Sequence, residues 1–236
     1  MYVAGDAFAA FIRGGGNRGL YRSVTAALRD LYRELPRPFA LADVGCGDGL
    51  ALVPAVDGID AMIAAIEPSA ALLTTATQAL ERAGARFEAF AMPIEDFIRD
   101  HGDRRFDLIQ STFALQSLPR DPRCGVLAWA RRAAGALVIV EFDVPSFADP
   151  RDPAFAAHVL ARYRRGIAEY DGDELVVQGF LMPVMFGYFT AGRARTNYEQ
   201  PVAEWLADLR AAGFRAVSSS MIDDYWWAPA VLLRAA

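Results

Sequence analysis

The amino-acid sequence predicts an α/β fold, in which a doubly wound sheet of seven strands ends in an antiparallel hairpin and carries an inserted cap. Short apolar runs alternate with helical patterns over residues 39–142, which is typical of βαβ units with right-handed crossovers and a parallel sheet. This alternation breaks after residue 145 and resumes at 199. Near the C-terminus two apolar runs are joined by a short turn, so their strands should pair antiparallel.

Hydrophobic spacing and chain-breaking residues define the individual elements. Residues 23–34 should form the first helix, because Val24, Leu28 and Leu31 share one helical face and Pro36 follows. The last expected helix, 202–212, stops at Gly213, a common helix terminator. The other expected helices are 69–83, 95–100, 122–133 and 154–169. The expected strands are 39–44, 59–66, 87–91, 106–110, 136–142, 214–221 and 227–234.

These patterns divide the chain into three parts. Residues 1–38 are expected to form an N-terminal helical lid. Residues 39–145 and 199–236 should form the sheet domain, and residues 146–198 the inserted cap. The cap combines one expected helix with a long apolar run over 175–189. A cap of this size favours an enclosed pocket for a small molecule.

Composition excludes several classes of chemistry. All 24 basic residues are Arg, so a Schiff-base lysine, a pyridoxal-phosphate lysine and a P-loop lysine are excluded. With two His and two Cys in 236 residues, we expect no zinc site and no other metal centre. The net charge of −5 and the lack of a basic stripe argue against a nucleic-acid partner. Composition predicts no oligomeric state.

The cysteine content, the N-terminal residues and the apolar stretches suggest a cellular location. Cys46 and Cys124 do not resemble a disulfide framework, which is typical of a reducing compartment. The N-terminus lacks the basic start and apolar run of a signal peptide. No apolar stretch is long enough to span a bilayer, so we expect no membrane partner and a cytoplasmic location.

A glycine-rich turn follows the first expected strand. It reads Asp-Val-Gly-Cys-Gly-Asp-Gly over residues 43–49 and opens a helical segment. Glycines there let a ligand approach the backbone and its amide donors. A dinucleotide fingerprint needs Gly or Ala three residues after its second Gly, but Leu50 and Leu52 occupy those places. The pattern is Gly-x-Gly-x-Gly instead, which disfavours an NAD-dependent oxidoreductase.

This turn resembles that of the class I S-adenosylmethionine-dependent methyltransferases, which have a Rossmann-like fold. The resemblance extends to Glu67, twenty residues after Gly47, and to segments 106–118 and 205–214. It implies S-adenosylmethionine as cofactor and a ribose-binding role for Glu67, since a carboxylate accepts two hydrogen bonds in a fork. It also implies cofactor contacts from the turn and from the residue after Glu67. These positions are Asp43, Gly45, Cys46, Gly47, Gly49 and Pro68.

Two segments depart from the family pattern. Pro93 occupies the position at which the family often places an acid for the adenine amino group. Ile94 can still pack on adenine, and Glu95 or Asp96 can replace the lost acceptor. After the fourth expected strand, where many relatives carry two His, this chain has Gln116-Ser117. Thr112, just before them, is expected to face either the core or the cofactor.

The lid and the cap supply further candidates. If residues 14–19 close over the cofactor, Arg18 and Tyr21 can reach its methionine carboxylate. His158 in the cap is the candidate general base, because an imidazole titrates near neutral pH. The cap's apolar run forms either plain core or a wall for an apolar substrate. The candidate substrate contacts in it are Met182, Met185, Phe186 and Tyr188.

The resemblance favours methyl transfer to a small, partly apolar molecule, as in enzymes that tailor natural products in secondary metabolism. Whether oxygen, nitrogen or carbon accepts the methyl group stays open. One alternative keeps the cofactor but performs a cyclisation without methyl transfer, which the missing His pair permits. Another is a non-enzymatic binding or regulatory protein on the same fold, which the intact glycine turn and Glu67 disfavour.

Overall fold

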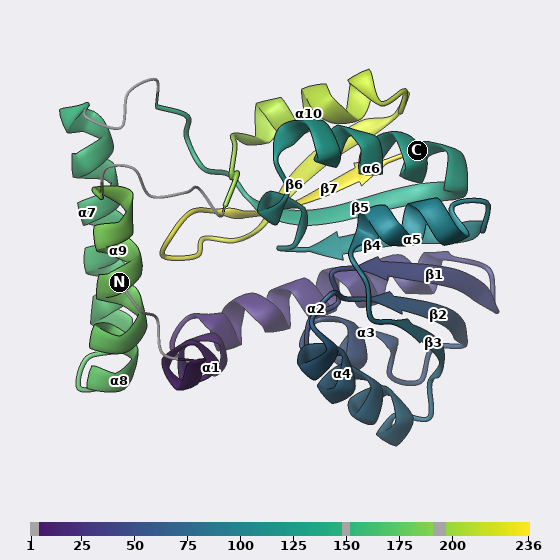
Figure 1. Cartoon of the computed structure of the whole chain (residues 1–236), viewed down its shortest axis with the longest axis horizontal. Coiled ribbons are helices and arrows are strands. Elements are labelled where there is room, and N and C mark those ends of the chain that lie inside the picture. The colour runs from purple at the N-terminus through teal and green to yellow at the C-terminus, as the bar shows by residue number, and fades with distance from the viewer. Residues whose placement is uncertain (1–4, 148–151, 191–196) are drawn as a thin grey trace.

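The structure is a computed structural model that describes residues 5–147, 152–190 and 197–236. A central twisted sheet has helices on both faces, and a helical lobe stands apart at one end (Figure 1). Seven strands form the sheet, as the sequence predicts. The strands are β1 (Phe39–Val44), β2 (Ala61–Ile66), β3 (Arg86–Phe90), β4 (Phe106–Thr112), β5 (Ala134–Phe142), β6 (Val217–Asp223) and β7 (Ala230–Ala235).

The strand order is β3-β2-β1-β4-β5-β7-β6. The five strands from β3 to β5 are parallel, whereas β7 runs antiparallel to both β5 and β6. The doubly wound sheet and its antiparallel final hairpin are therefore confirmed. The order reverses between β1 and β4, and in such sheets ligands bind at that point, outside the carboxyl ends of the strands.

Helices cover the two faces of the sheet with separate apolar clusters. On one face α2, α3 and α4 pack on the strands, and on the other α5, α6 and α10 do so. Within the described ranges, no helix combines the length and apolar character that a membrane crossing requires. The helices are α1 (Gly5–Arg13), α2 (Asn17–Glu34), α3 (Leu52–Val56), α4 (Ala70–Arg82), α5 (Ile94–His101), α6 (Arg120–Ala133), α7 (Pro153–Glu169), α8 (Glu174–Val176), α9 (Met182–Tyr188) and α10 (Val202–Ala211), with a 3₁₀ turn η1 (Leu115–Ser117) and a π-helical turn η2 (Val177–Leu181).

The N-terminal segment differs from its sequence-based description. Residues 5–13 form a helix that the sequence analysis did not identify, and α2 begins six residues before the expected start at residue 23. Leu20, Val24 and Leu28 of α2 are buried in the core on one face of the sheet. Only α1 and the turn after it therefore reach beyond the sheet domain. Residues 1–4 of the expected lid lie outside the described residues.

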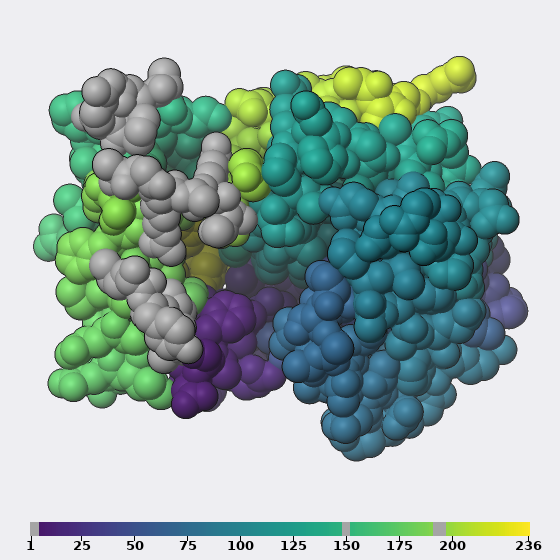
Figure 2. Space-filling view, in the orientation of Figure 1, coloured from purple at the N-terminus to yellow at the C-terminus, as the bar shows by residue number. Residues whose placement is uncertain are grey.

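The cap lobe consists of α7, α8, η2 and α9 and contacts α1 (Figure 1). The apolar run at 175–189 is helical throughout all but its last residue. Phe180 of η2 stacks on Phe11 of α1, with ring centroids 4.3 Å apart. A side chain at Gly179 would meet Ala7, with a Cβ–Cβ separation of 2.8 Å. In Figure 2, α1 (purple) lies between the cap (green) and the sheet domain (teal and blue).

Candidate active site

The glycine turn leads from the carboxyl end of β1 towards α3. Gly45, Gly47 and Gly49 all have positive φ angles, of 72°, 56° and 81°, a conformation that L side chains rarely adopt. A Cβ at Gly45 would collide with Ala114, and one at Gly49 would lie 2.7 Å from Cγ2 of Val53. A Cβ at Gly47 would meet nothing within 4 Å. The turn is thus packed from behind and open towards a cavity.

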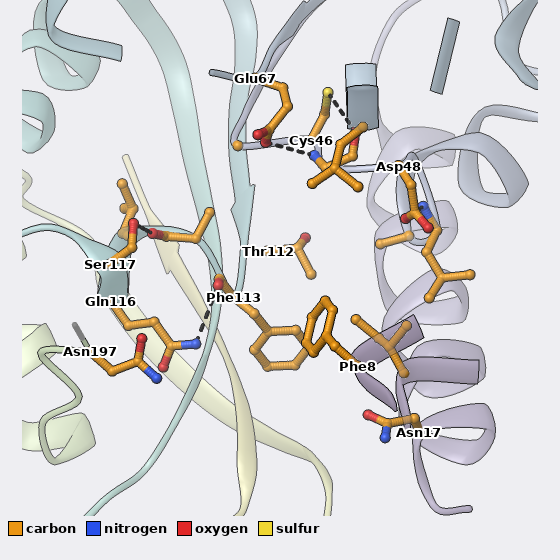
Figure 3. A pocket seen from close by; sticks show the side chains of 18 of the residues that line it. Phe8, Asn17, Cys46, Asp48, Glu67, Thr112, Phe113, Gln116, Ser117 and Asn197 are labelled. Carbon is orange, nitrogen blue, oxygen red and sulfur yellow. Dashed lines mark hydrogen bonds between the residues drawn. The ribbon is translucent and has the colours of Figure 1, made fainter. Parts of the chain in front are cut away.

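Glu67 follows β2 and faces this turn (Figure 3). Its Oε2 accepts a hydrogen bond from the Gly47 backbone N–H at 3.1 Å, and its Oε1 accepts one from the Ser69 N–H at 2.9 Å. The residue is only 8% exposed, yet it lines the cavity. Each carboxylate oxygen can accept a further hydrogen bond, because it carries two lone pairs. Glu67 is therefore held in place while it retains capacity for a ligand.

Asp43 precedes the glycine turn and is fully buried. Burial raises the pKa of its carboxyl to about 7, against the opposing effect of the Gln110 side chain, and the nearby Glu67 charge raises it further. Gln110 is oriented by Tyr32, whose hydroxyl donates to its Oε1. Oδ1 of Asp43 is buried and has no hydrogen-bond partner among the described residues. Asp43 thus brings an unsatisfied acceptor to the cavity wall.

One cavity of about 820 Å³ joins the glycine turn to the cap. Its cofactor end, as we name the part around the turn and Glu67, includes most positions that the sequence analysis assigned to cofactor binding. Pro93, which replaces the family's acid, also lines the cavity. The expected residues found in its lining are Asp43, Gly45, Cys46, Gly47, Glu67, Pro68, Ile94, Glu95, Thr112 and Tyr21. Gly49 supports the turn from behind instead.

Cys46 lines the cavity as a small turn residue. Burial raises the pKa of its thiol, and the neighbouring charges of Asp43 and Glu67 raise it further. The thiol is therefore protonated at neutral pH and is a poor nucleophile. Among the described residues, no group of three or more His, Cys, Asp or Glu side chains is arranged to hold a metal ion.

The opposite end of the cavity has aromatic walls. Trp226 packs flat over Gly166 of α7, where a Cβ would lie 2.7 Å from the ring. Phe113 and Phe142, at the carboxyl ends of β4 and β5, stack with centroids 4.5 Å apart. Counting Trp226, the cap and the β6–β7 loop contribute six rings. They belong to Tyr163, Phe180, Tyr188, Tyr225, Trp226 and Trp227.

Arg18 does not line the cavity. It is exposed, and its Nε donates to the Arg13 backbone oxygen at 2.8 Å. Arg13, at the end of α1, lines the cavity instead and forms an ion pair with Asp48 of the glycine turn. The sequence does not predict a role for Arg13, because its pattern does not indicate the helix α1. The last turn of α1 therefore supplies the arginine that lies beside the glycine turn.

His158 also lies outside the cavity lining. Its ring packs near Phe147 and Trp227, with centroids 5.5 and 6.1 Å away. Partial burial lowers the pKa of the imidazole, and the positive charge of Arg162 lowers it further. The ring is thus neutral near pH 7, and it contacts Trp227, which does line the cavity. The structure gives His158 no direct contact with the cavity.

Three of the four expected substrate contacts point away from the cavity. In α9 the cavity is lined by Val184 and Tyr188, which are four residues apart and so share one helical face. Met182, Met185 and Phe186 are absent from the lining, and Phe186 is 44% exposed. The sequence pattern predicts one role for the whole apolar run, either core or substrate wall. Its helical register separates these residues from Tyr188.

Three consecutive aromatic residues of the cavity, 225–227, were also missed. The sequence predicts a strand from residue 227, whereas β7 begins at Ala230. The signal was present, because three large aromatic side chains in succession do not follow the alternation of a half-buried strand. They lie in the β6–β7 loop, where all three are buried and line the cavity.

Comparison with known proteins agrees with this geometry. Residues 41–135 match the family model described as a methyltransferase domain. This match, together with the sheet order and the glycine turn, confirms the resemblance of the sequence to the class I S-adenosylmethionine-dependent methyltransferases. No curated protein matches the sequence at a significant level.

Solved structures share the fold at low sequence identity. Magnesium protoporphyrin IX methyltransferase from Synechocystis PCC 6803, with bound SAH, has a TM-score of 0.61 at 15% identity, over 93% of this chain and 83% of that one. An O-methyltransferase family protein from Burkholderia thailandensis has a TM-score of 0.58 at 17% identity. The match covers 90% of this chain and 55% of that one. The cyclopropane synthase MmaA2 from Mycobacterium tuberculosis has a TM-score of 0.56 at 15% identity. The match covers 84% of this chain and 63% of that one. The chain thus spans less than two thirds of the last two.

Proposed function

We propose that this protein transfers a methyl group from S-adenosylmethionine to a small, partly apolar molecule. The observation that carries the proposal is the single cavity that joins the glycine turn and Glu67 to the aromatic walls beside the cap. Such a cavity brings a nucleoside cofactor and an apolar acceptor together. By analogy with natural-product tailoring enzymes, we assign the reaction to secondary metabolism in the cytoplasm.

The described residues fit the cofactor. Gly47 leaves open space above the turn, and Glu67 retains acceptor capacity for both ribose hydroxyls. The buried side chain of Ile94 lines the cavity at the position expected for adenine packing, and Glu95 beside it offers a carboxylate. Glu67, Glu95 and Asp43 thus place three carboxyl groups in the lining of the cavity, which suits a cationic ligand.

S-adenosylmethionine supplies an electrophilic methyl group on a sulfonium sulfur. The protein's own contribution is alignment: the glycine turn and Glu67 fix one reactant, and the aromatic walls confine the other and exclude water. Holding two reactants in position can supply about 7–11 kcal/mol of the barrier reduction. Since His158 lies outside the lining, we assign the acceleration chiefly to this alignment rather than to a general base.

The direct test incubates the full chain with S-adenosylmethionine and a panel of small apolar acceptors, and follows both products by mass spectrometry. We expect S-adenosylhomocysteine to appear together with a product heavier by one CH₂ group. Binding of S-adenosylmethionine without either product would favour the cyclisation alternative. The absence of any binding in calorimetry would favour the non-enzymatic one.

A further inference from the structure

The loop after β4 carries an aromatic platform next to the glycine turn. Phe113, the first residue of this loop, lines the cavity and is half-buried. Its ring stacks on Phe142 at an interplanar angle of 14°, and Phe142 in turn stacks on Tyr225 at 21° and 5.4 Å. These three rings form a column of nearly parallel planes. Phe113 is the ring of this column that lies nearest to the glycine turn, because the next residue, Ala114, packs against Gly45.

The backbone of Phe113 is held in an unfavourable conformation. Its φ angle of 52° lies in the left-handed region, which bulky residues rarely adopt. Two hydrogen bonds fix it there: its N–H donates to the Val140 oxygen at 2.8 Å, and its own oxygen accepts from Gln116 Nε2 at 3.2 Å. Such strain tends to occur where a side chain must be presented to a ligand.

Gln116 adds one polar group to this aromatic surface (Figure 3). Because its Nε2 donates to a backbone carbonyl, which can only accept, its Oε1 is left as an acceptor. This oxygen is buried and has no hydrogen-bond partner among the described residues, although Gln116 lines the cavity. A buried unsatisfied acceptor is costly, so a ligand that donates an O–H or N–H here would gain affinity.

We propose that the methyl acceptor is a planar aromatic molecule with a hydroxyl or N–H group. Phe113 is the platform on which its ring stacks, and Gln116 Oε1 receives its hydrogen bond. The inference rests on the proposed function, since it names the substrate class of the same cavity. It explains why so many rings line this end of the cavity and why one acceptor atom among them is unsatisfied.

The test measures binding rather than turnover. The full chain is saturated with S-adenosylhomocysteine, and the dissociation constants of three probes are measured by calorimetry: 2-naphthol, its saturated counterpart decahydro-2-naphthol, and 2-naphthoate. We expect 2-naphthol to bind at least about tenfold more tightly than either of the others, because it alone combines an aromatic ring with a hydrogen-bond donor.

Variants then separate the two contacts. Phe113→Leu should weaken 2-naphthol binding about threefold to tenfold and leave decahydro-2-naphthol nearly unaffected. A fourth probe, 2-methylnaphthalene, keeps the aromatic rings but has no hydrogen-bond donor. Gln116→Met should remove the preference for 2-naphthol over this probe. The matched control is Phe186→Leu on the exposed face of α9, which should change none of these constants. Circular dichroism and S-adenosylhomocysteine affinity report whether each variant is folded, and Phe113→Tyr should retain the aromatic preference.

The outcomes distinguish the two proposals. If the wild-type chain does not bind S-adenosylhomocysteine, the proposed function fails. If it does bind, but decahydro-2-naphthol or 2-naphthoate binds as tightly as 2-naphthol, the aromatic substrate class is overturned while methyl transfer stands. Equal losses for the aromatic and the saturated probe in Phe113→Leu would overturn the role of Phe113. If a variant does not fold, the wild-type comparison alone decides.

Discussion

At the residue scale, Glu67 connects the protein's own turn to the proposed ligand. Its two oxygens accept hydrogen bonds from the backbone of Gly47 and Ser69, and the carboxylate faces the cavity. The same group therefore orders the glycine turn and, in the proposed complex, offers acceptors to the ribose. This double role means that its removal affects both the preformed shape of the site and a direct contact.

Replacing Glu67 by Ala should weaken S-adenosylmethionine binding about a hundredfold or more. Two hydrogen bonds to a charged acceptor contribute about 1.5–3 kcal/mol each, and 1.4 kcal/mol corresponds to a factor of ten. Calorimetry measures the dissociation constant. Glu88→Ala, on the exposed strand β3, is the matched control and should bind as the wild type does. An unchanged constant in Glu67→Ala would refute the ribose assignment.

A second buried acid, Glu141 of β5, should make stability depend on pH. Burial raises the pKa of its carboxyl to about 8, opposed by the hydrogen bond from the Gln116 N–H. The unfolded chain releases this proton near its ordinary pKa of 4.5. Between these values the folded state binds more protons than the unfolded state. The free energy of unfolding should therefore fall as pH rises, by up to about 1.4 kcal/mol per pH unit.

Glu141→Gln tests this dependence, because the amide cannot ionise. Asp43, whose pKa is raised to about 7, contributes a fall of its own at lower pH. The clearest window is therefore pH 7–8, where urea unfolding should show a shallower decline for Glu141→Gln than for the wild type. Glu88→Gln is the control, since hydrogen bonds from Arg104 lower the pKa of that exposed carboxyl. Identical slopes for wild type and Glu141→Gln would contradict the prediction.

At the scale of elements, one buried side chain ties the lid, the cap and the final hairpin together. Asn17 donates through Nδ2 to the Phe11 oxygen at 2.9 Å and to the Tyr170 hydroxyl at 3.0 Å, and its Oδ1 accepts from the Tyr225 hydroxyl at 3.1 Å. These partners belong to α1, to the end of α7 and to the β6–β7 loop. The walls of the cavity thus share a single polar junction.

Asn17→Ala should destabilise the protein by about 1–3 kcal/mol, because it leaves buried groups without partners. It should also expose the cap to proteolysis, since three elements lose their common contact. Urea unfolding and limited trypsin digestion measure the two effects. Arg18→Ala, one position along and exposed, should change stability by less than about 0.5 kcal/mol. Equal stability of the two variants would show that the junction contributes little.

At the scale of the whole molecule, the fold gathers the site at one edge of the sheet. The glycine turn follows β1, Glu67 follows β2 and Phe113 follows β4, so all three lie at carboxyl ends beside the reversal of strand order. The cap and α1 close the other side of the cavity. Catalysis by alignment is the chemistry that this architecture favours, because its walls hold two molecules in contact.

His158→Gln is the test at this scale. A general base typically contributes about 10²–10⁴-fold to a rate, but the ring of His158 lies outside the cavity lining. We expect turnover to fall by less than about tenfold and the pH profile of the rate to keep its shape. Steady-state kinetics between pH 5.5 and 8.5 would show this. A hundredfold loss would restore His158 as the base.

The sequence by itself determined the fold and much of the cofactor end. The glycine turn is a local pattern, and its distance from Glu67 follows from one βα unit. The parallel sheet followed from the alternation of strand and helix patterns, and the antiparallel end followed from the short turn between the last two apolar runs. These features depend on residues that are close in the chain or repeat regularly, so the sequence contains them directly.

Only the tertiary structure decided the aromatic end of the cavity. Val184 and Tyr188 face it while Phe186 faces solvent, because packing against α7 and η2 sets the rotation of α9. Arg13 replaced Arg18 because α1 docks on the cap through Phe11 and Phe180. Contacts between residues more than a hundred positions apart determine such orientations, and the periodicity of one segment does not specify which partner it meets.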